Sequence, residues 1–217
     1  MSVRVKTARR RSVSSTGWLA RQLNDPYVQR ARREGYRSRA AYKLAEIDDR
    51  FHLLRPGMRV VDLGAAPGGW TQVAAARVAA PARGKIVAMD VLAMDPVPGA
   101  IVLNLDFLAP DAPSAITAAL GERADIVLSD MAAPAMGHAA TDHLRIVALA
   151  EAAYEFARGV LAPGGSFVAK VYQGGAETTL LRQLKRDFSA VRHAKPPASR
   201  TDSAEVYVVA TGFRAAE

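Results

Sequence analysis

The sequence predicts an α/β fold built on a mostly parallel, seven-stranded sheet with helices on both faces. Seven short apolar runs have the length and composition of strands, at residues 59–64, 85–90, 100–106, 124–130, 166–171, 189–194 and 205–211. Helical segments alternate with most of these runs, which is typical of a parallel sheet. The last two runs are joined by a loop without helical periodicity, so we expect them to pair antiparallel and to give the sheet an antiparallel edge strand.

The helices are predicted from the spacing of apolar residues. Ser38 is expected to cap the first helix, whose apolar positions are Ala40, Leu44, Ile47 and Phe51. An Ala-rich helix is predicted over residues 69–80 and a short one near 112–121. A long helix is predicted over roughly 142–161, with apolar residues at Leu144, Val147, Ala150, Tyr154, Ala157 and Leu161. A last helix is predicted from the spacing of Leu180, Leu184 and Phe188.

The positive charge of the chain is concentrated near its start. Residues 1–55 contain 14 Lys and Arg against 5 Asp and Glu, a balance of +9, and residues 56–217 contain 15 against 16, a balance of −1, which together give the total of +8. Because basic clusters attract phosphate polymers, residues 26–43 are predicted to contact RNA, whereas residues 1–20 are expected to be a flexible tail with at most loose RNA contact. The candidate RNA-binding residues are Arg30, Arg32, Arg33, Arg37 and Arg39.

The same charge pattern suggests a domain boundary. We expect residues 1–30 to form a basic, flexible N-terminal extension and residues 31–217 to form the folded domain. For residues 1–24, which are rich in Arg and Ser, an ordinary solvated tail and an organelle transit peptide are alternative interpretations.

The composition excludes several classes of site. The chain has no cysteine, which excludes disulfides, thiolate metal sites and cysteine nucleophiles. Its four histidines show no metal-ligand spacing, so no metal is expected. No apolar run approaches the roughly 18–20 residues that a membrane helix needs. We therefore expect a soluble, cytoplasmic protein, and a monomer because the sequence shows no interface signature.

A glycine-rich turn after the first predicted strand indicates a cofactor site. Residues 62–70 read DLGAAPGGW, and in open α/β sheets ligands bind beyond the carboxyl ends of the strands. The turn lacks the G-x-G-x-x-G spacing of dinucleotide sites, which place a pyrophosphate on a helix N-terminus. Acidic residues instead stand at four successive strand ends, at Asp62, Asp90, Asp106 and Asp130. This pattern suits S-adenosylmethionine, which carries an adenosine and a sulfonium cation, better than a nicotinamide dinucleotide.

The cofactor turn is one of six segments that resemble the FtsJ-type ribosomal RNA 2′-O-methyltransferases. The others read RSRAAYKL at 37–44, MDP at 94–96, SDM at 129–131, FVAKV at 167–171 and EVYVVATG at 205–212. The matches occur in order over about residues 25–213, which is far more specific than a single motif. The chain departs from the family after residue 131, where the family often has Ala-Pro-Asn and this sequence reads AAPAMGH.

The resemblance implies a Rossmann-like S-adenosylmethionine-dependent methyltransferase fold and a Lys-Asp-Lys-Glu catalytic tetrad. Matched motif by motif, the tetrad falls on Lys43, Asp130, Lys170 and Glu205. Cofactor binding falls by the same route on Gly68, Trp70, Asp90, Asp106 and Asp130. The implied reaction is methylation of a uridine ribose in bacterial 23S ribosomal RNA, with that RNA or the large ribosomal subunit as partner.

The implied chemistry suggests a role for each member of the tetrad. Transfer to a ribose hydroxyl requires alignment of the reacting atoms and assistance with loss of the hydroxyl proton. We expect Lys170 to accept this proton or orient the hydroxyl, Asp130 to orient Lys170, and Lys43 and Glu205 to position the ribose. Without the resemblance, the four residues would be interpreted as two ordinary ion pairs. The alternatives are a 2′-O-methyltransferase acting on transfer or messenger RNA and a non-catalytic RNA-binding protein on the same scaffold.

Overall fold

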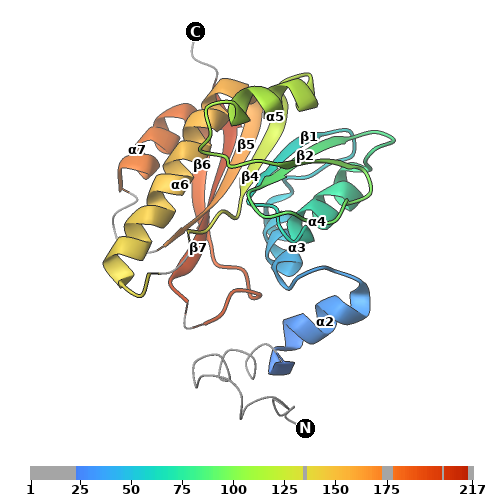
Figure 1. Ribbon diagram of the computed structural model, residues 1–217. Helices are drawn as coiled ribbons and strands as arrows, with labels where there is room; N and C mark the ends of the chain where they lie inside the picture. Colours follow the sequence, from blue (N-terminus) through green and yellow to red (C-terminus); the bar gives the residue numbers. More distant parts are fainter. Residues whose placement is uncertain (1–22, 134–135, 173–177, 202, 215–217) are drawn as a thin grey trace.

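A seven-stranded sheet forms the centre of the molecule (Figure 1). The computed structural model describes residues 23–133, 136–172, 178–201 and 203–214. The strands are β1 (Arg59–Leu63), β2 (Lys85–Asp90), β3 (Ala100–Asn104), β4 (Ala124–Ser129), β5 (Leu161–Tyr172), β6 (Phe188–Ala194) and β7 (Glu205–Phe213). Their order across the sheet is β3-β2-β1-β4-β5-β7-β6. The predicted α/β fold with a mostly parallel sheet is therefore confirmed.

One strand runs against the others, and it is not at the edge. Strands β1 to β5 pair in parallel, whereas β7 pairs antiparallel with both β5 and β6. The expected antiparallel pairing of the last two strands is confirmed, but the reversed strand lies one place inside the edge that the prediction gave it. The burial of the two strands explains this order, because residues 206–210 of β7 are all buried whereas β6 is partly exposed.

Helices cover both faces of the sheet (Figure 1). Alternate residues of each strand point to opposite faces. Val60, Ile86 and Leu128 pack with helices on one face, α3 (Ala40–Phe51) and α4 (Gly69–Val78). Their neighbours along the strands pack on the other face with α5 (Ala112–Leu120), α6 (Ala139–Val160) and α7 (Thr178–Asp187). The result is three layers with an apolar core on each side of the sheet.

Three details of the predicted helices are wrong. Helix α3 begins after Arg39 and has no side-chain cap, because the Ser38 hydroxyl is buried without a hydrogen-bond partner. Leu144, predicted to face the core, is 62% exposed near the start of α6. Phe188 is buried as expected, but it is the first residue of β6 rather than part of α7. The errors at Ser38 and Phe188 fall at helix ends, where apolar spacing defines the boundary poorly, whereas Leu144 lies in the second turn of α6.

Helix α2 (Pro26–Glu34) precedes the sheet and packs against α3. Asp25 caps it by accepting hydrogen bonds from the backbone of Tyr27 and Val28. The Tyr27 ring meets Tyr42 of α3 at 5.5 Å between centroids. The domain boundary predicted at residue 30 therefore falls inside a packed helix. Residues 1–22 of the predicted extension lie outside the described residues, and none of the described helices is long and apolar enough to cross a membrane.

Candidate active site

The sheet brings the side chains of the predicted tetrad to one edge and one face. Lys170 of β5 lies opposite Tyr207 of β7 in the strand register. Glu205 precedes Tyr207 by two residues, so both side chains point to the same face. Asp130 directly follows β4, and α3, which carries Lys43, covers this face of the sheet. Residues distant along the chain therefore meet at the carboxyl ends of the parallel strands.

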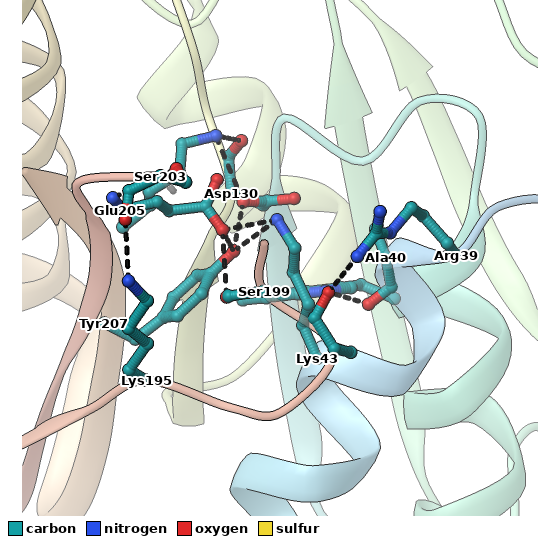
Figure 2. Close-up of polar contacts among 12 residues, drawn as sticks. Arg39, Ala40, Lys43, Asp130, Lys195, Ser199, Ser203, Glu205 and Tyr207 are labelled. Atoms are coloured by element: carbon teal, nitrogen blue, oxygen red, sulfur yellow. Dashed lines mark hydrogen bonds and ion pairs between the residues drawn. The ribbon is translucent and has the colours of Figure 1, made fainter. Parts of the chain in front are cut away.

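The four predicted residues form two ion pairs. Lys43 Nζ lies 2.5 Å from Glu205 Oε1, and Figure 2 shows the two side chains pointing toward each other. Lys170 Nζ donates to the backbone oxygen of Asp130 at 2.7 Å and to its Oδ1 at 3.1 Å. Lys170 is the most enclosed of the four, with a side chain only 7% exposed. Both pairs are shielded enough for their charges to interact more strongly than exposed pairs do.

Tyr207 joins the two pairs and was not among the predicted site residues. Its hydroxyl lies 2.8 Å from Asp130 Oδ1 and 3.2 Å from Glu205 Oε1, and it accepts a hydrogen bond from Lys43 Nζ at 3.3 Å (Figure 2). Burial, together with the two carboxylates, raises the pKa of Tyr207 well above its ordinary value, so the hydroxyl keeps its proton. The alternation of β7, which puts Tyr207 beside Glu205, was the signal available in the sequence.

A cavity of about 350 Å³ opens next to the tetrad at the ends of β1, β2, β3 and β4. It is lined by residues that follow these strands and by part of α6: Gly64, Ala66, Met89, Asp90, Val91, Leu92, Leu105, Asp106, Phe107, Leu108, Asp130, Met131, Ala132 and Leu149. Asp130 belongs to both the cavity wall and the tetrad. A larger hollow of about 870 Å³ is lined by Arg59, Lys85 and Gly121, at the other ends of the strands, so size alone does not locate the site.

Three of the five predicted cofactor residues line this cavity, and two do not. Asp90, Asp106 and Asp130 are in its wall. Gly68 is instead pressed against Arg37 and Val97, and its φ of +107° is a conformation that favours glycine. Trp70 is buried, donates from Nε1 to the backbone oxygen of Ala40 at 2.8 Å, and packs on Tyr207. Both residues shape the turn around the cavity from outside.

The lining of the cavity fits S-adenosylmethionine. Three carboxylates and a mainly apolar wall suit a ligand that combines an adenosine with positive charge, whereas an anionic pyrophosphate would meet these carboxylates directly. Asp90 Oδ2 accepts the backbone N–H of Ala66 at 2.9 Å and Oδ1 that of Leu92 at 2.8 Å. These bonds fix the carboxylate and leave its remaining lone pairs for ligand hydroxyls.

Beneath the cofactor turn, Asp62 is fully buried at the end of β1. Thr71 donates to Asp62 Oδ2 at 2.7 Å, and Oδ1 has no hydrogen-bond partner. Burial raises the pKa of Asp62 to about 7, and the charges of Asp130 and Asp90 act in the same direction. Burial is the larger cause, and the two neighbouring carboxylates add to it.

The arginines predicted to contact RNA differ in their surroundings. Arg32 and Arg33 are exposed on α2 and form no ion pair within the part of the chain that the structure describes. Arg30 pairs with Glu34 at 2.8 Å. Arg37 and Arg39 are engaged with the protein itself: Arg39 binds Asp25 and the backbone oxygen of Ala198, and Arg37 binds three backbone oxygens.

Comparison with known proteins agrees with this geometry. The model of the FtsJ-like methyltransferase family matches residues 36–213. A ribosomal RNA large subunit methyltransferase E from Paramagnetospirillum magneticum is 66% identical over 99% of this chain and 89% of its own, and one from Xanthobacter autotrophicus is 64% identical over 99% and 85%. A crystal structure assigned as a ribosomal RNA methyltransferase from Plasmodium falciparum is 29% identical, with a TM-score of 0.74 over 83% of this chain and all of its own.

The match spans the cofactor turn, the cavity and every member of the tetrad. The chain belongs to the FtsJ-like methyltransferase family and uses S-adenosylmethionine as its methyl donor.

Proposed function

We propose that the protein methylates the 2′-hydroxyl of a uridine ribose in 23S ribosomal RNA, in the large subunit or its precursor. One observation carries the proposal: the side chains of Lys43, Asp130, Lys170 and Glu205 converge beside a cavity whose wall includes Asp130. The RNA substrate is supported by relatives that are named as large-subunit ribosomal RNA methyltransferases and align over nearly the whole chain. The reaction would take place in the cytoplasm, by a protein that we expect to be a monomer.

Lys170 is the residue that we assign to the acceptor hydroxyl. A lysine ammonium has three N–H donors, and two of those of Lys170 engage Asp130. The third is left to hold the oxygen of a ribose hydroxyl beside the cavity. The positive charge of the ammonium then favours transfer of the hydroxyl proton to the neighbouring Asp130 carboxylate as the new carbon–oxygen bond forms.

The other members of the tetrad keep Lys170 and the ribose in place. Asp130 fixes Lys170 through both its side chain and its backbone oxygen. Lys43 and Glu205 form a second ion pair, which the Tyr207 hydroxyl joins to Asp130, and we assign to this pair the positioning of the ribose. S-adenosylmethionine, when bound, supplies the methyl group as an electrophile on a sulfonium sulfur. Because the protein groups are already linked by hydrogen bonds, little reorganisation is needed when the acceptor arrives.

Methyl transfer from tritiated S-adenosylmethionine tests this function. Large ribosomal subunits, protein-free large-subunit RNA and transfer RNA are offered in parallel, and the product nucleoside is identified by mass spectrometry. We expect 2′-O-methyluridine in large-subunit RNA. Label in a base, or in transfer RNA alone, would refute the proposed substrate.

The assignment of Lys170 is tested with Lys170→Met, which keeps most of the side-chain volume but removes the charge. We expect methylation to be abolished while cofactor binding, measured by calorimetry, survives. Lys85→Met is a matched control, because Lys85 is exposed at the start of β2, far from the tetrad. Turnover retained in Lys170→Met would contradict the assignment.

A further inference from the structure

Arg37 is held by the backbone oxygens of two separate segments of the chain. Its Nη1 donates to Pro67 at 3.2 Å and to Asp95 at 2.6 Å, and its Nη2 donates to Pro96 at 2.6 Å. No carboxylate of the described residues lies within ion-pair distance of this guanidinium. The planar fork of arginine thus serves to bridge two loops rather than to balance a charge.

These two segments form the walls of the cofactor cavity. The first follows β1 and lines the cavity with Gly64 and Ala66, and the second follows β2 and lines it with Asp90, Val91 and Leu92. On the cavity side, the Asp90 carboxylate ties the walls together through the N–H of Ala66. On the outer side, Arg37 ties them together a second time, at Pro67 and at residues 95 and 96.

The packing around Gly68 shows how closely Arg37 fits these walls. A Cβ atom at Gly68 would lie 3.0 Å from Arg37 Nη1 and 3.0 Å from Val97 Cγ2. Such distances are shorter than ordinary van der Waals contacts, so the turn, Arg37 and the loop at residue 97 already touch. The turn therefore cannot shift outward while Arg37 stays in place.

The segment that carries Arg37 also leads directly to Lys43. The Arg37 backbone N–H donates to Gln72 Oε1 at 2.9 Å, and Gln72 Nε2 donates to the Gly35 oxygen at 3.0 Å. Trp70, at the start of α4, donates to Ala40, the first residue of α3. The cofactor turn and the helix that bears Lys43 are thus joined on both sides of Arg37.

We propose that Arg37 is a positioning residue that latches the two walls of the cofactor cavity and sets them against the start of α3, rather than an RNA-contacting residue. It touches neither the cavity nor the tetrad, and it acts through the loops that it holds. The inference rests on the proposed function only for the comparison with RNA binding. Its consequence is that loss of Arg37 weakens cofactor binding and leaves RNA affinity unchanged.

Calorimetric titration with S-adenosylmethionine, without RNA, measures the first half of this consequence. We expect Arg37→Ala to raise the Kd about tenfold or more, since each factor of ten corresponds to about 1.4 kcal/mol, the scale of one or two lost hydrogen bonds. Arg37→Lys should restore binding only in part, because a single ammonium cannot bridge both loops as the fork does. Arg33→Ala on α2 is the matched control, and its Kd for the cofactor should equal that of the unchanged protein.

Co-sedimentation with unmethylated large ribosomal subunits, without cofactor, measures the second half. In this assay the effects of the two substitutions should be reversed. Arg33→Ala should bind the subunits more weakly than the unchanged protein, and Arg37→Ala should bind them equally well. Unchanged cofactor binding together with lost subunit binding in Arg37→Ala would overturn the proposal. If the unchanged protein bound the cofactor but no subunits, the proposed substrate would fail while the cofactor comparison would still decide the role of Arg37.

Hydrogen exchange separates a local latch from a general loss of fold. In Arg37→Ala, peptides covering residues 64–69 and 92–97 should exchange faster, while those from β4 and β5 should not change. Faster exchange throughout the sheet would overturn the proposal, because Arg37 would then support the whole domain.

Discussion

At the scale of single residues, Tyr207 takes as full a part in the polar contacts of the candidate site as the four predicted tetrad residues do. Its hydroxyl contacts Lys43, Asp130 and Glu205 together. Because the hydroxyl stays protonated, it can serve as a donor to one carboxylate while it accepts from Lys43. The two ion pairs are therefore parts of one hydrogen-bonded network, and a substitution in one pair should alter the energy of the other.

Removal of the Tyr207 hydroxyl should slow the reaction without weakening cofactor binding. In Tyr207→Phe we expect turnover to fall by roughly tenfold or more, because hydrogen bonds to charged groups contribute about 1.5–3 kcal/mol. The Kd for S-adenosylmethionine should be unchanged, since Tyr207 does not line the cavity. Single-turnover kinetics and calorimetry measure the two quantities. A full rate in Tyr207→Phe would show that the two ion pairs act independently.

Asp62 should make the stability of the cofactor-free protein depend on pH. Its folded-state pKa of about 7 lies above the ordinary value of 3.8. A raised carboxyl pKa stabilises the fold below the unfolded-state value, and this contribution is lost as the pH rises through about 7. The loss is at most on the order of 4 kcal/mol.

Urea unfolding across this pH range checks the expectation. The unfolding free energy of the unchanged protein should fall between about pH 4 and pH 8, and that of Asp62→Asn should fall much less. Asp106→Asn, at an exposed position of the same cavity, should keep the full dependence. Parallel curves for all three proteins would exclude Asp62 as the titrating group.

At the scale of elements, α2 and the connection from β6 to β7 are fastened to α3 by shared polar partners. Glu46 of α3 accepts the Tyr27 hydroxyl at 3.0 Å and the Ala198 N–H at 2.7 Å. Arg39 binds Asp25 and Ala198 from the other side. The same connection carries Ser199, which lies 3.3 Å from Glu205 Oε1. These contacts link the start of the described chain to one wall of the tetrad.

Loss of the Glu46 carboxylate should therefore destabilise the protein more than loss of a surface carboxylate. We expect Glu46→Ala to lower the unfolding free energy by about 1–3 kcal/mol, because two enclosed donors lose their acceptor. Glu122→Ala is the control, since its side chain is 73% exposed and its pair with Arg59 should contribute no more than about 1 kcal/mol. Equal midpoints of urea unfolding for the two variants would contradict the inference that Glu46 holds α2 and the β6–β7 connection against α3.

The sequence predicted the elements well and their boundaries and order less well. Apolar runs identified all seven strands because each run is local, although β3 and β6 at the two edges are only partly buried. The insertion of β7 between β5 and β6 depends on pairing between distant segments, which no local pattern encodes. Motif matching singled out four residues that form two neighbouring ion pairs, but it did not single out Tyr207, whose place between them depends on the pairing of β5 with β7. Arg37 and Arg39 were predicted to contact RNA from charge alone, and a sequence does not reveal that their guanidinium groups donate to backbone oxygens of the same chain.

At the scale of the whole molecule, the net charge of +8 sets the expected response of RNA binding to salt. Residues 1–55 carry the excess, and Arg9, Arg10 and Arg11 are three of its charges. Each phosphate contact with single-stranded RNA contributes about 0.7 to the slope of log affinity against log salt. Binding should therefore weaken steeply as the ionic strength rises.

Replacing Arg9, Arg10 and Arg11 together by glutamine should make this slope shallower by up to about 2. Fluorescence anisotropy with labelled ribosomal RNA over a series of KCl concentrations measures it. Turnover at saturating RNA should be unchanged, because none of these residues is among the predicted catalytic or cofactor-binding positions. An unchanged slope would place the RNA contacts elsewhere in the chain.

Because β7 runs antiparallel to β5, its last residue lies far from the tetrad, at a place suited to attaching the enzyme to a surface or a dye. Glu205 begins this strand beside the tetrad. Phe213 ends it at the opposite end of the sheet, where Arg214 lines a hollow with Arg123 and Arg158. A tether joined to the chain beyond Arg214 would therefore leave the molecule with its methylating edge facing the solution, open to a partner as large as a ribosomal subunit.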